Sequence, residues 1–117
     1  MTSTEKLKYI VEAADEIKAE GIETLDVRGK TAQVDYFVVC TGTSDRHVSS
    51  IADKVTEELA KRKSKPLRMD GEGTGWIIQD YGDIFVNVMR EETRQFYDLE
   101  TLWKSYQTSP DYPVEPS

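Results

Sequence analysis

Several kinds of residue are scarce in this chain of 117 residues, and each scarcity excludes a class of protein. A single cysteine, Cys40, rules out an internal disulfide, and one cysteine with one histidine rules out the usual zinc sites. No apolar run approaches the ~18 residues of a membrane-spanning helix. The N-terminal MTSTEKLKYI also lacks the basic start and apolar stretch of a signal peptide. We therefore expect a cytoplasmic protein with no membrane contact.

Positively charged residues are also fewer than negatively charged ones. Fifteen Lys and Arg stand against 22 Asp and Glu, which gives a net charge of −7. Binding along a phosphate backbone needs dense Lys and Arg, so we expect little direct contact with nucleic acid. An acidic chain instead favours a basic protein partner, or none.

The residues that are present fit one α/β domain. Apolar residues three or four apart predict helices, and short β-branched or aromatic runs predict strands. The helices are expected over about 4–20, 44–63 and 91–106, and the strands at 22–28, 35–41, 66–70 and twice within 76–89. The resulting order, αββαβββα, predicts a mixed sheet of about five strands with helices packed on it. We expect a single domain over 1–107 and a disordered tail over 108–117.

Capping residues mark the helix ends. Thr2 and Glu5 have capping-box spacing, Gly21 is a suitable residue to end the first helix, and Ser44 is a good N-cap for the second. The turn around Ser44 could hold an anion at the helix start, but a capped loop is the favoured interpretation. His47 in the first turn is interpreted as a structural residue, and Cys40 as a core residue.

The stretch WIIQDYGDIFVNVM, residues 76–89, predicts a hairpin with Tyr81-Gly82 as its loop. This register places Asp80 opposite Asp83 and Trp76 opposite Asn87. One face is then core, with Gln79 as its polar exception. The other face carries Trp76, Ile78, Phe85, Asn87 and Met89, with Asp80 and Asp83 near the turn.

Two accounts of that second face remain open. It is either covered by a helix of the same chain or partly exposed as a docking surface. A tryptophan and a methionine among a few polar groups is the composition of a protein interface. Tyr81, at the tip of the predicted turn, would be an exposed aromatic residue beside Asp80 and Asp83.

Four stretches together resemble the ribosomal silencing factors, also called the Iojap family. They are DYFVVCTGTSDRHVSSIADKV (35–55), the Gly-Glu-Gly of 71–73, the hairpin 76–89 and RQFYDLETLW (94–103). With the first helix and LDVRGK (25–30), the resemblance covers nearly the whole chain before the tail.

The resemblance implies a translational repressor with a nucleotidyltransferase-like fold and no catalytic activity, cofactor or metal. Family members bind the large ribosomal subunit through its protein numbered fourteen and block joining of the small subunit. Off the ribosome they tend to form homodimers. The family's tryptophan falls on Trp76 and an often apolar position on Tyr81, whereas Asn87 stands where the family usually has a histidine.

The resemblance and the mixed face together predict one partner-binding surface. It comprises Trp76, Asp80, Tyr81, Asp83, Asn87 and Met89. Two alternatives stay open. One is a metal-dependent nucleotidyltransferase, in which Asp70 and Glu72 would share a metal near Ser44. The other is a dimerisation module without ribosomal function.

Overall fold

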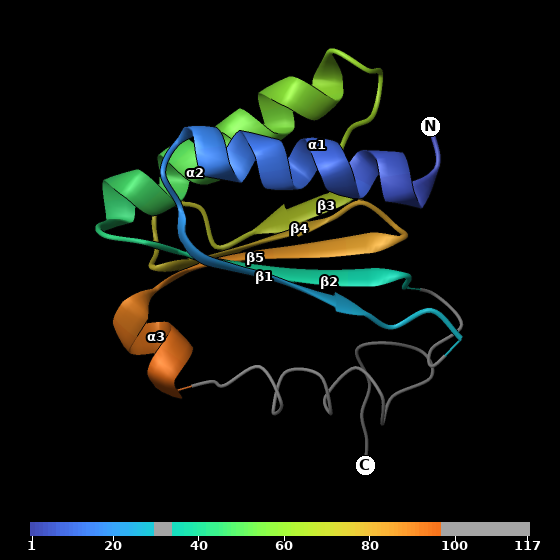
Figure 1. Cartoon of the computed structure of the whole chain (residues 1–117). Helices are drawn as coiled ribbons and strands as arrows, with labels where there is room; N and C mark the ends of the chain where they lie inside the picture. The colour runs from blue at the N-terminus through green and yellow to red at the C-terminus, as the bar shows by residue number, and fades with distance from the viewer. Residues whose placement is uncertain (30–33, 97–117) are drawn as a thin grey trace.

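Three helices and five strands make up the described part of the chain, which in this computed structural model is residues 1–29 and 34–96 (Figure 1). In chain order they are α1 (Ser3–Glu16), β1 (Glu20–Asp26), β2 (Tyr36–Gly42), α2 (Asp45–Ala60), β3 (Arg68–Asp70), β4 (Trp76–Asp80), β5 (Ile84–Arg90) and α3 (Glu91–Phe96). The predicted order αββαβββα is confirmed. Residues 97–107 of the expected domain and the expected tail 108–117 lie outside the described residues.

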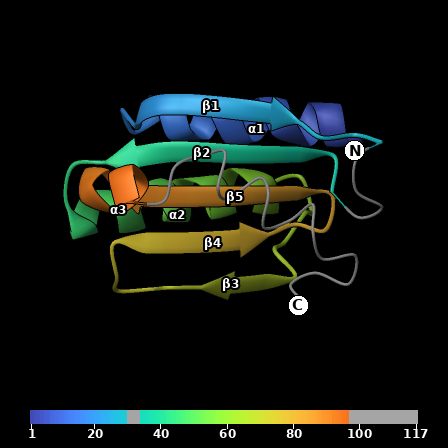
Figure 2. The ribbon, with the colours of Figure 1, turned by 90° about the horizontal axis from the view of Figure 1, so that it is seen from below.

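The five strands form one mixed sheet in the order β1-β2-β5-β4-β3. The central pair, β2 and β5, is parallel, and every other pairing is antiparallel. Figure 2 shows the sheet from the face away from α1 and α2, with β1 and β3 at its two edges. The predicted mixed sheet of about five strands is therefore confirmed.

One face of the sheet is covered by α1 and α2, while α3 lies on the opposite side (Figure 1). The stripe of α2 that faces the sheet is fully buried, as its apolar spacing predicts. It packs on side chains from β2, β4 and β5 that point to the helices. The central members of this first apolar cluster are Ile10, Val38, Cys40, Ile51, Val55, Leu59, Ile84, Val86 and Val88.

The opposite face of the sheet carries a second apolar cluster. Its buried members are Val27, Val34, Phe37, Val39, Phe85 and Met89, and Leu25 and Trp76 pack against it. All seven residues of β2 are buried as a result, as expected for a central strand with apolar side chains on both faces. The second face of the hairpin thus contributes mainly to an internal cluster.

The helix starts are as predicted, but the end of α1 is not. The hydroxyl of Thr2 accepts a hydrogen bond from the Glu5 amide (3.1 Å), the Glu5 carboxylate accepts one from the Thr2 amide (3.0 Å), and Ser44 caps α2. Helix α1 ends at Glu16, and Lys18 takes a positive φ (64°) directly after it, while Gly21 has the positive φ (54°) that was expected there. A distant contact contributes, because a ring nitrogen of His47 lies 2.7 Å from the carbonyl oxygen of Ile17, the helix C-cap.

Gly21 has a different role, in the irregular start of β1. Its carbonyl oxygen accepts a hydrogen bond from the guanidinium of Arg94 in α3 (2.7 Å), and the same nitrogen donates to the Thr41 hydroxyl (2.8 Å). A Cβ at Gly21 would lie 2.8 Å from that nitrogen, so the missing side chain makes room for Arg94. No described residue of α3 is buried, and Arg94 joins this helix to β1 and β2. Of the helix expected over 91–106, the part after Phe96 lies outside the described residues.

Gln79, the polar exception of the core face, is fully buried and bonded. Its amide nitrogen donates to the carbonyl oxygen of Ala52 (3.0 Å) and lies 2.9 Å from the Thr56 hydroxyl, both on α2. Its amide oxygen lies 3.5 Å from the hydroxyl of Tyr81. Burial of an amide is tolerated when its hydrogen bonds are made inside the protein, and here they join strand β4 to α2.

The hairpin register predicted from the sequence is wrong by two residues. Asp80 lies opposite Phe85 and Trp76 opposite Met89, and the amide of Tyr81 donates to the carbonyl oxygen of Ile84 (2.9 Å). The loop is therefore Gly82-Asp83, with the positive φ (90°) at Gly82 that a two-residue turn needs. Because a shift of two preserves the alternation of side chains, the two faces keep their predicted residues.

Tyr81 consequently lies on the core face and not at the turn tip. Only 5% of its surface is exposed, so the expectation of an exposed aromatic docking residue is wrong. Burying an aromatic ring in the first apolar cluster is more favourable than leaving it in solvent, and the turn moves along the chain accordingly. Burial also raises the pKa of Tyr81 to about 12 and that of the Cys40 thiol to about 12.

These two buried acids predict a loss of stability in alkaline solution. Above the ordinary values of 9.0 for Cys40 and 10.0 for Tyr81, the unfolded chain releases protons that the folded chain retains until about 12. The free energy of unfolding should therefore fall as the pH rises through this window, and these groups should contribute no pH dependence below it. Tyr81→Phe should make the fall shallower, measured by urea unfolding at a series of pH values. An unchanged slope would show that Tyr81 ionises equally in both states.

Candidate functional site

Only part of the predicted partner-binding set reaches the surface. Trp76 is half-buried at the start of β4, whereas Asn87 and Met89 are fully buried on β5. Asn87, Met89 and Tyr81 are thus not exposed side chains, and their direct contact with a partner stays a prediction. The residues of β5 on the second face are buried, so the partly exposed residues of that face lie on β4: Trp76, Ile78 and Asp80.

The two aspartates of the predicted surface have structural partners. The Asp80 carboxylate accepts a hydrogen bond from the Gly82 amide (2.7 Å) and so shapes the turn. Asp83 pairs with Lys6 of α1 at 2.9 Å, and its carbonyl oxygen accepts the amides of Asp35 and Tyr36 at the start of β2. Both side chains stay partly exposed, but each already has a bonding partner within the protein.

The Trp76 side chain is held by Asn87 of β5. The indole nitrogen of Trp76 donates to the amide oxygen of Asn87 (3.1 Å), and the Asn87 amide nitrogen lies 3.5 Å from the carbonyl oxygen of Val38. Asn87 therefore acts on the surface through Trp76. A ring whose orientation is fixed in advance loses little conformational freedom when a partner binds it.

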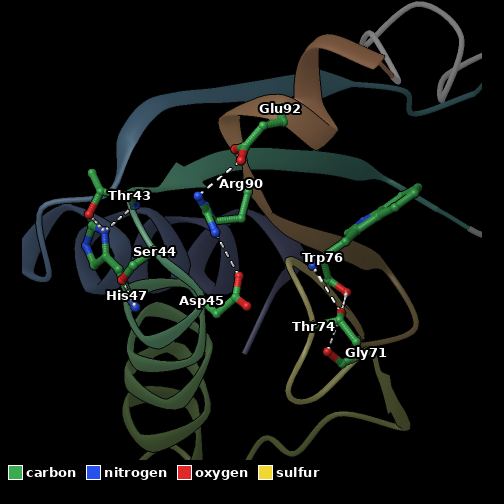
Figure 3. A network of polar contacts seen from close by, with 9 residues as sticks. All are labelled: Thr43, Ser44, Asp45, His47, Gly71, Thr74, Trp76, Arg90 and Glu92. Atoms are coloured by element: carbon green, nitrogen blue, oxygen red, sulfur yellow. Dashed lines mark hydrogen bonds and ion pairs between the residues drawn. The ribbon is translucent and has the colours of Figure 1, made fainter.

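The backbone around Trp76 is fixed by the glycine-rich loop before it. The Trp76 amide donates to the hydroxyl of Thr74 (3.2 Å), and the Thr74 amide donates to the Gly71 carbonyl oxygen (2.9 Å) (Figure 3). Gly71 has φ 91°, and a Cβ there would lie 2.0 Å from the carbonyl oxygen of Trp76. Only glycine satisfies both conditions at this position.

Arg90 joins this loop to the start of α2. Its guanidinium bonds to Asp45 (3.0 Å) and to Glu92 (3.1 Å), and its amide donates to the carbonyl oxygen of Gly75 (2.8 Å). Figure 3 shows Arg90 between Asp45 and Glu92, with Trp76 projecting to one side. Exposed ion pairs of this kind contribute little stability each. Their effect here is to position the end of β5 beside the Trp76 loop.

The turn before α2 lies at the carboxyl ends of the parallel strands β2 and β5, where α/β proteins commonly bind ligands. Two of its amides, however, already have acceptors. The Thr43 amide donates to Nδ1 of His47 (2.9 Å), and the His47 amide donates to the Ser44 hydroxyl (3.0 Å). Asp45 adds a negative charge to the first turn. The capped-loop interpretation of this turn is confirmed, and so is the structural role of His47, both of whose ring nitrogens are engaged.

No observation favours the nucleotidyltransferase alternative. Asp70 is an exposed edge-strand residue whose nearest cation is Arg68, at 3.8 Å, and Glu72 is exposed in the loop that follows. Within residues 1–29 and 34–96, no group of three or more His, Cys, Asp or Glu side chains could hold a metal ion. Cys40 is buried in the centre of β2, as expected of a core residue. In the same part of the chain, the helices are too short or too polar to cross a membrane.

Sequence reasoning missed the residues that support Trp76. Thr74 and Arg90 were assigned no role, and Gly71 was noted only within the Gly-Glu-Gly stretch of the resemblance. Three glycines within residues 71–75 were the available signal, since clustered glycines often mark backbone that folds closely on itself. The ion pairs of Arg90 could not be foreseen, because Asp45 is 45 positions away in the sequence.

Comparison with known proteins points to one family. A family model described as "Ribosomal silencing factor during starvation" matches residues 1–116. The ribosomal silencing factor RsfS of Haemophilus influenzae is 37% identical over 98 residues, which cover 83% of this chain and 96% of that protein. A crystal structure of a protein from Chromobacterium violaceum superposes with a TM-score of 0.84 at 30% identity and covers 97% of this chain and 98% of that one.

A more distant mammalian protein is also similar. The mouse protein named "Mitochondrial assembly of ribosomal large subunit protein 1" is 32% identical over 89 residues. The match covers 73% of this chain and 39% of the mouse protein.

The support of Trp76 by Gly71 can be tested with a matched pair of glycines. Gly71 and Gly73 both have positive φ (91° and 83°), but a Cβ at Gly73 would have no atom within 4 Å. Gly73→Ala should therefore cost about 1–2 kcal/mol for its backbone conformation alone. Gly71→Ala should cost roughly 1–3 kcal/mol more, because backbone atoms must move. Urea unfolding measures both values.

The same pair of variants reports on the tryptophan itself. The indole N–H resonance of Trp76 should shift in Gly71→Ala and stay in place in Gly73→Ala, because only the first alanine contacts Trp76. Equal effects of the two alanines on stability and on this resonance would mean that the loop does not position the ring.

Proposed function

This chain belongs to the ribosomal silencing factor family, and we propose that it represses translation by binding the large ribosomal subunit through the protein numbered fourteen. Bound there, it would occupy space that the small subunit needs, and the two subunits would fail to join. The mechanism is steric and requires no chemical step. Since subunits join in the cytoplasm, the proposal implies a cytoplasmic protein.

Similarity to its relatives supports a ribosomal role. The matching family is named for ribosomal silencing during starvation, and the mouse relative is named for assembly of the mitochondrial large subunit. Both names concern the ribosome, and the second concerns its large subunit. They support the proposed class of partner.

The observation that carries the proposal at the residue level is the environment of Trp76. Its ring is half-buried, bonded to Asn87 and supported by Thr74 and Gly71, so it is ordered before any partner arrives. Aromatic side chains that are rigid and only partly covered are typical anchors of protein interfaces. We propose that Trp76 is such an anchor, flanked by Arg90 and the exposed residues of the 72–74 loop.

The net negative charge of this protein supports a partner that is positively charged. The net charge of −7 favours rapid association with a positively charged ribosomal protein. Asp80 and Asp83, which bond within the turn and to Lys6, would add to this long-range attraction. Close ion pairs to the partner would contribute little affinity from these positions.

We propose in addition that the free protein is a homodimer, as the resemblance implies. The expected result is a mass of twice 13.3 kDa in sedimentation equilibrium without ribosomes. A mass of one chain at all concentrations measured would contradict this part of the proposal and leave ribosome binding untouched.

Replacement of Trp76 tests the proposed surface. Trp76→Ala should weaken binding to purified large subunits by at least about tenfold, the effect expected of an interface anchor, in a co-sedimentation titration. The same variant should restore joining of the two subunits in a sucrose gradient, whereas the unaltered protein should prevent it.

Trp76→Phe serves as the control for packing. It keeps an aromatic ring packed against the second apolar cluster but removes the N–H that bonds to Asn87, so an intermediate loss of binding is expected. Circular dichroism at the assay temperature must show that each variant is folded. Folded Trp76→Ala that co-sediments as well as the unaltered protein would refute the surface, and subunits that join normally beside the unaltered protein would refute the function.

A further inference from the structure

One segment of this acidic protein is strongly basic. Residues 61–68 read KRKSKPLR, five cations without a single acidic residue. The segment carries +5 and the whole chain −7, so the remaining residues carry −12. The net charge of the chain suggests little contact with nucleic acid, but this one segment has a local excess of positive charge.

The basic segment has a defined conformation. It connects the end of α2 to β3, and backbone hydrogen bonds fix it. Among them, the Lys63 amide donates to the carbonyl oxygen of Ala60 (2.9 Å), that of Ser64 to Leu59 (2.9 Å) and that of Leu67 to Asp80. Lys63 has a positive φ of 62°, which ends the helical turn. The cations of the segment are thus presented from an ordered backbone.

The five cations differ in whether they contact other side chains of the protein. Lys61 pairs with Glu58 at 3.0 Å, and Arg62 lies over the ring of Tyr9 at 3.6 Å from its centre. In contrast, Lys63 and Lys65 are exposed and form no ion pair with the described residues. Arg68 is also exposed (61%), and its contact with Asp70 is long, at 3.8 Å. Lys63, Lys65 and Arg68 are therefore available to an outside partner.

The basic segment and Trp76 flank the same edge strand. The segment leads into β3 at one end, and the loop that precedes Trp76 leaves β3 at the other (Figure 2). Arg68 lies opposite Asp80 at the far end of β4 from Trp76. Four residue steps along a strand span about 13 Å, so one large partner could contact both features.

We infer that Lys63, Lys65 and Arg68 bind phosphate groups of ribosomal RNA on the large subunit, beside the protein contact made by Trp76. This inference rests on the proposed function, because it names a second component of the same binding surface. Exposed lysine and arginine side chains without internal partners are the groups that neutralise RNA phosphates. The acidic remainder of the molecule would face basic ribosomal protein, and the basic segment would face the RNA backbone.

The salt dependence of binding tests this inference. Each phosphate contact adds roughly 0.7–0.9 to the slope of the logarithm of affinity against the logarithm of salt concentration. Lys63→Gln/Lys65→Gln should therefore reduce the slope for purified large subunits by about 1.4–1.8. Between 50 and 200 mM salt, the unaltered protein should lose roughly tenfold more affinity than this variant.

Lys18 provides a matched control for Lys63. Both lysines are exposed, both follow a helix, and their φ angles are 64° and 62°. Lys18, however, lies among Asp15, Glu16 and Glu20, and outside the basic segment. Lys63→Gln should reduce the slope by about 0.7–0.9, whereas Lys18→Gln, which changes the net charge equally, should leave it unchanged.

Photo-crosslinking identifies the partner. Leu67 is 74% exposed in the middle of the segment, so a photoreactive residue at this position keeps all five cations. Crosslinks to ribosomal RNA are expected on irradiation of the large-subunit complex. Crosslinks to ribosomal protein alone would overturn the inference.

The outcomes for the inference and for the proposed function are distinct. If the unaltered protein fails to bind large subunits, both the proposed function and the inference are refuted. If it binds and Lys63→Gln/Lys65→Gln binds with the same affinity and the same slope, only the inference falls. A reduced slope for Lys63→Gln/Lys65→Gln, together with an unchanged slope for Lys18→Gln, supports both the inference and the proposed function.

Discussion

The burial of β2 and β5 on both faces is the constraint on which the rest of the structure depends. Two parallel strands with apolar residues on each side must be covered on both faces of the sheet. Helices α1 and α2 cover one face, and the second apolar cluster occupies the other. The hairpin therefore cannot offer a whole face to a partner, because Phe85 and Met89 are needed inside. The exposed part is the rim, where Trp76 begins β4.

The sequence predicts the elements well because each has a local signal. Apolar periodicity located α2, the capping box located the start of α1, and continuous apolar residues located β2. The predictions that proved wrong concern contacts between distant segments. The hairpin turn moved because Tyr81 joins the core and because the Asp83 carbonyl bonds to the start of β2. Helix α1 ended early, where His47, 30 positions away, bonds to Ile17.

The candidate site could be predicted only in part for the same reason. Trp76 was identified from composition and resemblance, and of the aromatic or apolar residues on the second face of the hairpin, Trp76 and Ile78 retain exposed surface. Asn87 was named as a contact, and in the structure it orients the indole. Whether a side chain reaches solvent depends on which segments cover it, and alternation along a strand carries no such information. Supports such as Arg90 depend on ion pairs across the fold.

The connection between α2 and β3 can change its charge without a change of fold. No residue of 61–68 belongs to either apolar cluster, and neither Lys63 nor Lys65 forms an ion pair with a described residue. Lys61 and Arg62, in contrast, contact Glu58 and Tyr9. Substitutions at Lys63 and Lys65 would therefore alter the electrostatic field at this edge of the molecule and leave the sheet intact.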